Sequence, residues 1–104
     1  ESNRLRFQEG FGRSWVTATC VVRLADSRTD RTERSLTQAG IDTRRWWGEG
    51  AHVHSATAAF PRTLLPATEA LAASTIAIPF SRDLESDEIQ RIAEAVHAAS
   101  QADK

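Results

Sequence analysis

The sequence contains no methionine and only one lysine among its 104 residues. Because the chain begins at Glu1 without an initiator, we expect a processed product or a piece of a longer polypeptide. The single lysine is the terminal Lys104, whereas the chain carries 12 arginines. Chemistry that requires a lysine Schiff base inside a formed pocket is therefore not expected on this chain alone.

Cysteine is almost absent, and long apolar runs are absent. The single Cys20 cannot form an internal disulfide, so we expect a small buried side chain and a cytoplasmic protein. No run approaches the roughly 18 apolar residues of a membrane helix, and no signal-peptide pattern opens the chain. We expect no membrane partner.

Large apolar side chains are also scarce. Alanine accounts for 17 residues, while Leu, Ile, Val and Phe together number 21. A chain of this length forms one domain, which here has a thin core and marginal independent stability. The net charge of −1 favours folding over disorder. The arginine-rich first half could attract phosphates, but its arginines alternate with acidic residues, so we expect a solvated surface and no nucleic-acid partner.

The densest recognition chemistry lies in one segment, Arg44-Arg45-Trp46-Trp47-Gly48-Glu49-Gly50-Ala51-His52. Guanidinium groups suit carboxylates or phosphates, and indoles offer flat surfaces for stacking. Two glycines allow a sharp turn or a close approach to a ligand. The alternative is a twisted strand end whose tryptophans fill the core and whose arginines are solvated.

Hydrophobic periodicity predicts a small α+β domain with a short, mainly antiparallel three-stranded sheet and helices on one face. The predicted strands are 15–24, 41–47 and 75–80. The first has Val16, Ala18, Cys20 and Val22 on one face, and Pro79 marks the end or edge of the last. Residues 1–14 are expected to be a lead-in or a linker to something upstream, 15–100 the domain and 101–104 a frayed tail.

Three helices are predicted around these strands. The first, 29–39, is capped by Thr29, stops at Gly40 and has a thin apolar stripe that suggests a surface position. The second starts at Leu65-Pro66 and continues to Ser74, with Leu71 as its anchor. The third is capped by Ser86 and presents an apolar face formed by Ile89, Ile92, Ala93 and Val96.

No catalytic or metal site is predicted from residue spacing. His52 and His54 could share one face of a strand, but a third and fourth metal ligand have no candidates. The chain contains no P-loop, no GxGxxG and no GxSxG motif.

Four motifs in order, between Ala39 and Ala98, carry a family resemblance. They are A-G-I-D-T-R-R-W-W-x-x-G-A-H, L-P-A-T-E-A-L-A, I-A-I-P-F and L-x-x-x-E-I-x-x-I-x-x-A. This order resembles the C-terminal part of the DegT/DnrJ/EryC1/StrS family of pyridoxal-phosphate sugar aminotransferases. The loop from Arg45 to His52 is most similar to members acting on nucleotide-linked 4-keto-6-deoxyhexoses.

The resemblance implies the small domain of a fold-type-I aminotransferase, the aspartate-aminotransferase fold. It implies pyridoxal 5'-phosphate in the full-length protein but none bound to this fragment, since the cofactor lysine belongs to the preceding large domain. The implied partners are that upstream domain, a nucleotide-sugar substrate, a glutamate donor and a second subunit. The implied substrate-binding residues are Arg44, Arg45, Trp46, Trp47 and His52.

The sequence departs from the family pattern at several positions, and two other functions stay open. Ala51, the run Val53-His54-Ser55 and the start of the 15–24 strand differ from relatives, which leaves the sugar open. A pyridoxal-phosphate dehydratase of the same fold is a close variant. The rival from another class is a free-standing module that binds phosphate or sugar nucleotides, or regulates a partner.

Overall fold

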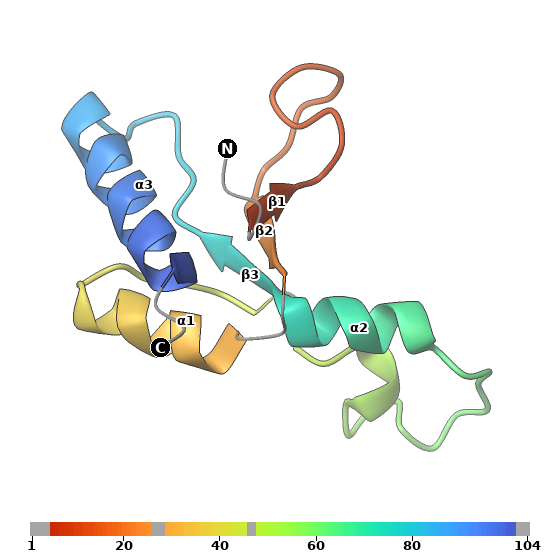
Figure 1. Ribbon diagram of the computed structural model, residues 1–104. Coiled ribbons are helices and arrows are strands. Elements are labelled where there is room, and N and C mark those ends of the chain that lie inside the picture. Colours follow the sequence, from red (N-terminus) through yellow and green to blue (C-terminus); the bar gives the residue numbers. More distant parts are fainter. Residues whose placement is uncertain (1–4, 26–28, 46–47, 102–104) are drawn as a thin grey trace.

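The computed structural model describes residues 5–25, 29–45 and 48–101, and these form three strands, three α-helices and one short 3-10 helix (Figure 1). The strands are β1 (Leu5–Phe7), β2 (Cys20–Leu24) and β3 (Thr75–Ile78). The helices are α1 (Thr29–Gln38), the 3-10 helix η1 (Ala51–Val53), α2 (Pro66–Ser74) and α3 (Ser86–Gln101). Within the described part, no helix is long and apolar enough to cross a membrane.

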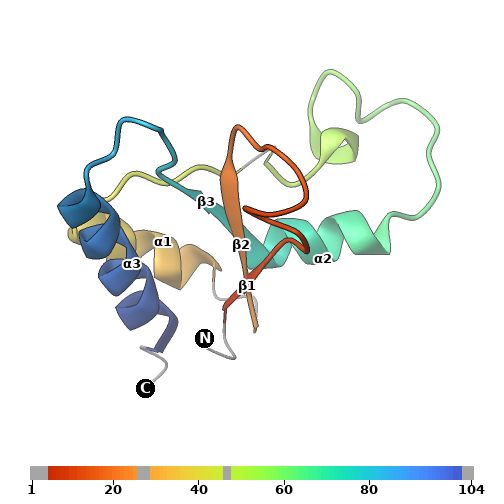
Figure 2. The same ribbon diagram turned by 90° about the horizontal axis from the view of Figure 1, so that it is seen from above.

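The sheet is antiparallel throughout, in the order β1-β2-β3. Alternate residues of β2 are buried, and Val22 pairs with Ile76 of β3 at the centre of the core. Helices α1 and α3 lie together on one side of the sheet, while α2 and the 51–65 segment lie at the opposite end of the molecule (Figures 1 and 2). The predicted α+β class, with three antiparallel strands and helices packed on the sheet, is confirmed.

Helix α1 occupies the predicted range but not the predicted surface position. Leu36 has no exposed area, and Thr29 and Thr32 are buried beside it. The apolar stripe looked thin because threonine counts as polar, although its methyl group packs in a core. Gly40 ends the helix with a φ of 77°, and the N–H of Ile41 then bonds back to the Leu36 carbonyl at 2.9 Å.

The predicted second strand, 41–47, is wrong over its described residues 41–45. Arg44 forms a single isolated bridge with Ala77, through backbone bonds of 3.0 and 2.8 Å. Ile41 is held by the end of α1 and is buried in the core. The segment is therefore fixed at two points rather than along a ladder. Trp46 and Trp47 lie outside the described residues.

The predicted first strand, 15–24, is correct only over its last five residues. Val16 is fully exposed, and Thr17 and Thr19 form a local side-chain turn that competes with strand pairing. The Trp15 indole donates back to the Glu9 carbonyl at 2.9 Å. Instead, β1 forms within the residues expected to be a lead-in, and it pairs with β2.

The two later helices begin where the sequence predicts, but their exposed residues differ. Pro66 is the first residue of α2, as predicted, whereas Leu71 is half exposed and does not anchor the helix. In α3, Ile92 and Val96 are buried, while Ile89 and Ala93 are exposed. Ser86 is not the cap, because the N–H of Glu85 donates to the Glu88 carboxylate at 3.0 Å.

A buried hydroxyl connects α1 to α2. Thr29 Oγ1 donates to the carbonyl of Ala73, one of the last carbonyls of α2, which have no partner within the helix. We expect Thr29→Val to lower the free energy of unfolding by about 1 kcal/mol, because the hydrogen bond of this buried hydroxyl to the Ala73 carbonyl is lost. Urea denaturation followed by circular dichroism measures the change.

Thr75→Val is the matched control for Thr29→Val. Thr75 Oγ1 also donates to a carbonyl, that of Leu71, but at an exposed position where water can replace it. We expect a change within about 0.5 kcal/mol. If the two variants lowered the free energy of unfolding by the same amount, burial of the Thr29 hydroxyl would not explain its contribution to stability.

Cys20 is buried, and burial raises the pKa of its thiol. Because the thiolate is the reactive form, we expect the folded chain to react with a thiol reagent more than about tenfold more slowly than the urea-unfolded chain. The unfolded state loses this proton at lower pH than the folded state, so stability should fall as the pH rises past the ordinary thiol pKa. Equal rates in the two states would contradict this burial.

Candidate functional site

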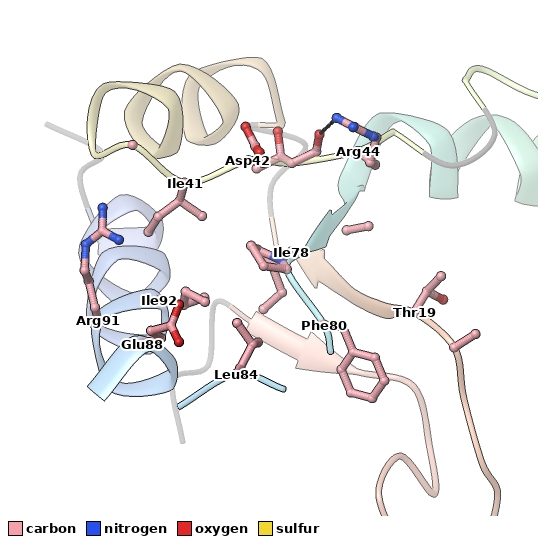
Figure 3. A pocket seen from close by; sticks show the side chains of 15 residues that line it. Thr19, Ile41, Asp42, Arg44, Ile78, Phe80, Leu84, Glu88, Arg91 and Ile92 are labelled. Carbon is pink, nitrogen blue, oxygen red and sulfur yellow. Dashed lines mark hydrogen bonds between the residues drawn. The ribbon is translucent and has the colours of Figure 1, made fainter. Parts of the chain in front are cut away.

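The structure places the described recognition residues at separate points. Arg44 lines a pocket of about 390 Å³ beside the sheet, which Figure 3 shows between α3, the 40–44 segment and β3. Its guanidinium donates to the Thr43 carbonyl at 3.1 Å. Glu88 and Arg91 also line this pocket, and Arg91 donates to the Ala39 carbonyl at 2.8 Å.

Arg45 contacts α1. Its NH1 atom lies 3.1 Å from Asp30 Oδ1 and 3.6 Å from Glu33 Oε2. Two carboxylates therefore compensate its charge within the chain. This contact fixes the start of the recognition segment against the first turns of α1.

His52 is the most enclosed of these residues. It lies in η1, and only 4% of its side chain is exposed. Its Nε2 atom lies 3.2 Å from Glu69 Oε1, in the first turn of α2. Pro66 starts this helix without an unused N–H and so fixes its first turn, which contains Glu69.

The second nitrogen of His52 has no partner among the described residues. Nδ1 is buried and accepts no hydrogen bond from the described residues. It lies against Gly50, where an added Cβ atom would come within 2.7 Å of both Nδ1 and Cε1. A buried polar atom without a partner is uncommon and requires an explanation.

A pocket of about 820 Å³ lies beside this imidazole, within the size range of ligand pockets. Apart from His52 and His54, the described residues that line it are glycines, alanines, threonines and leucines. His54 accepts a bond from the Ala56 N–H at 3.1 Å. Within the described residues, no group of three His, Cys, Asp or Glu side chains could hold a metal ion.

Sequence reasoning identified His52 but missed its partner. Glu69 lies 17 positions further along the chain. No short motif joins them, because their contact depends on how α2 packs against η1. The two glycines Gly48 and Gly50 did indicate a turn next to His52, and Gly50 adopts a φ of 113° there.

Comparison with known proteins identifies a family. A sequence model of the DegT/DnrJ/EryC1/StrS aminotransferase family matches residues 2–97. A search of curated proteins found no matching sequence.

Proposed function

The chain belongs to the DegT/DnrJ/EryC1/StrS aminotransferase family, and from this premise we propose that it is the C-terminal domain of an enzyme that aminates a nucleotide-linked keto-sugar. The family comprises pyridoxal-phosphate-dependent sugar aminotransferases. The amino donor in this proposal is an amino acid, glutamate. The enzyme acts in the cytoplasm as a homodimer.

The residues of this chain do not supply the attachment point of the cofactor. No lysine occurs in the described part, and the only one in the sequence is Lys104. Pyridoxal phosphate, when bound, supplies an electron sink for amino-group transfer. In this proposal an upstream large domain holds the cofactor, and the chain alone is inactive.

The contribution of this chain is a wall of the substrate cleft. The observation that carries the proposal is the enclosed His52 imidazole, held by Glu69 beside a pocket of about 820 Å³. His52 binds the substrate there, and the family resemblance adds either Trp46 or Trp47, which lie outside the described residues, as a stacking surface. Arg44, whose guanidinium contacts only a backbone carbonyl in the described structure, is available for the diphosphate or the donor carboxylate.

Arg45 has a smaller role in ligand binding than the sequence suggested. Asp30 and Glu33 already pair with it. A ligand anion would have to compete with two carboxylates. We propose that Arg45 mainly fixes the recognition segment against α1.

The first test is the coding sequence immediately upstream of Glu1, followed by an assay of the encoded polypeptide. We expect a large α/β domain with a cofactor lysine, and glutamate-dependent amination of a nucleotide-linked 4-keto-6-deoxyhexose. A histidine in place of that lysine would favour the dehydratase. A start codon directly before Glu1, with tight and salt-dependent ligand binding by the chain alone, would favour the free-standing module and overturn the enzyme.

A further inference from the structure

The two nitrogens of His52 have different surroundings. Nε2 lies 3.2 Å from a carboxylate oxygen of Glu69, whereas Nδ1 is buried and has no partner in the described part of the chain. An ionised carboxylate only accepts hydrogen bonds, so Nε2 carries the hydrogen. In the neutral imidazole, Nδ1 is then an acceptor that lacks a donor.

We propose that Glu69 is a positioning residue that holds His52 in the Nε2–H tautomer, so that Nδ1 accepts a hydrogen bond from a sugar hydroxyl. The identity of the ligand rests on the proposed function, while the tautomer rests on the geometry alone. Glu69 does not touch the ligand in this arrangement. It acts through the imidazole, as carboxylates do when they orient histidines.

The charge around the pocket favours a hydroxyl over a phosphate. Phosphate groups are bound most strongly by cations, and the described lining contains no Arg or Lys. The Glu69 carboxylate is 58% exposed and lies in the first turn of α2, where it offsets the positive end of that helix. An uncharged sugar ring therefore suits this pocket, and the diphosphate binds elsewhere.

A ligand reaches Nδ1 only when the neighbouring turn moves. Gly50 lies directly against this nitrogen, and Gly48 and Gly50 both have a positive φ. Glycine permits such a turn to change conformation at low steric cost. Binding should therefore alter the Gly50 amide signal together with the His52 ring.

Nitrogen-15 NMR of the chain tests the tautomer directly. We expect His52 to show the Nε2–H pattern at mildly alkaline pH, with the three histidines assigned through His54→Gln and His97→Gln. Glu69→Ala should give a mixture of tautomers. Glu94→Ala is the matched control, because it removes another exposed helical carboxylate that accepts a bond, from Gln90 at 2.8 Å. A wild-type Nδ1–H pattern, or no change in Glu69→Ala, would overturn the positioning role and leave the proposed function standing.

Two probes then test the ligand chemistry. At millimolar concentration, dTDP-glucose should shift the His52 Nδ1 and Gly50 signals, whereas dTDP should not. Glu69→Ala should weaken dTDP-glucose binding about tenfold, the value of one hydrogen bond, and Glu94→Ala should not. Equal shifts with dTDP would overturn the sugar hydroxyl but not the proposed function. No shift with either probe would overturn the sugar hydroxyl as the ligand of Nδ1 and leave the proposed function standing, because this chain supplies only one wall of the cleft.

Discussion

Replacing Leu36 with alanine should lower the free energy of unfolding by about 2–5 kcal/mol, the usual cost of a Leu→Ala cavity. Leu36 is 0% exposed and packs in the cluster that joins β2, β3 and α3. Small domains have a total stability of only about 5–15 kcal/mol, and this core contains few large side chains. We therefore expect the urea midpoint to fall by about 1–3 M, given a typical denaturant dependence.

Leu64→Ala provides the matched control. It removes the same atoms from a side chain that is 87% exposed, and should change stability by less than about 0.5 kcal/mol. Circular dichroism and near-ultraviolet signals should give coincident transitions for both variants. If the two midpoints agree, α1 does not pack in the core as described.

Leu36 also illustrates how far the sequence predicts this fold. The end of the helix followed from Gly40, because glycine conformation is a local property, and the helix starts at Thr29 although the Thr29 hydroxyl donates to Ala73 of α2. The buried position of α1 was missed because two of its three buried residues are threonines. Strand β1 was missed because three residues carry no periodicity, and pairing with β2 alone defines them.

The candidate site shows the same division between local and long-range effects. His52 and the glycine turn were visible as a cluster of residue types in the sequence. The ionic partners of these residues lie far away in the sequence. Arg45 pairs with Asp30, 15 positions earlier, and His52 pairs with Glu69, 17 positions later. Packing between elements decides such contacts, so residue spacing could not predict which ionic groups remain available to a ligand.

Replacing Gly50 with alanine should have the largest effect at the site. The φ of 113° and ψ of 155° belong to a region that is almost restricted to glycine, which costs other residues about 1–3 kcal/mol. The added Cβ atom would also come within 2.7 Å of the His52 ring and 2.9 Å of Thr68 Cγ2. The ring must therefore move, and we expect loss of both the His52–Glu69 hydrogen bond and the preference for the Nε2–H tautomer.

Gly48→Ala separates backbone strain from this collision. Gly48 also has a positive φ, 71°, but an added Cβ atom meets nothing within 4 Å. We expect it to cost about 1–2 kcal/mol through the left-handed backbone alone, with the His52 nitrogen signals unchanged. Thermal unfolding gives the stability of both variants, and nitrogen-15 NMR gives the state of the ring. Wild-type His52 signals in Gly50→Ala would mean that the turn does not lie against the imidazole, and that Nδ1 is open to solvent donors rather than reserved for a ligand.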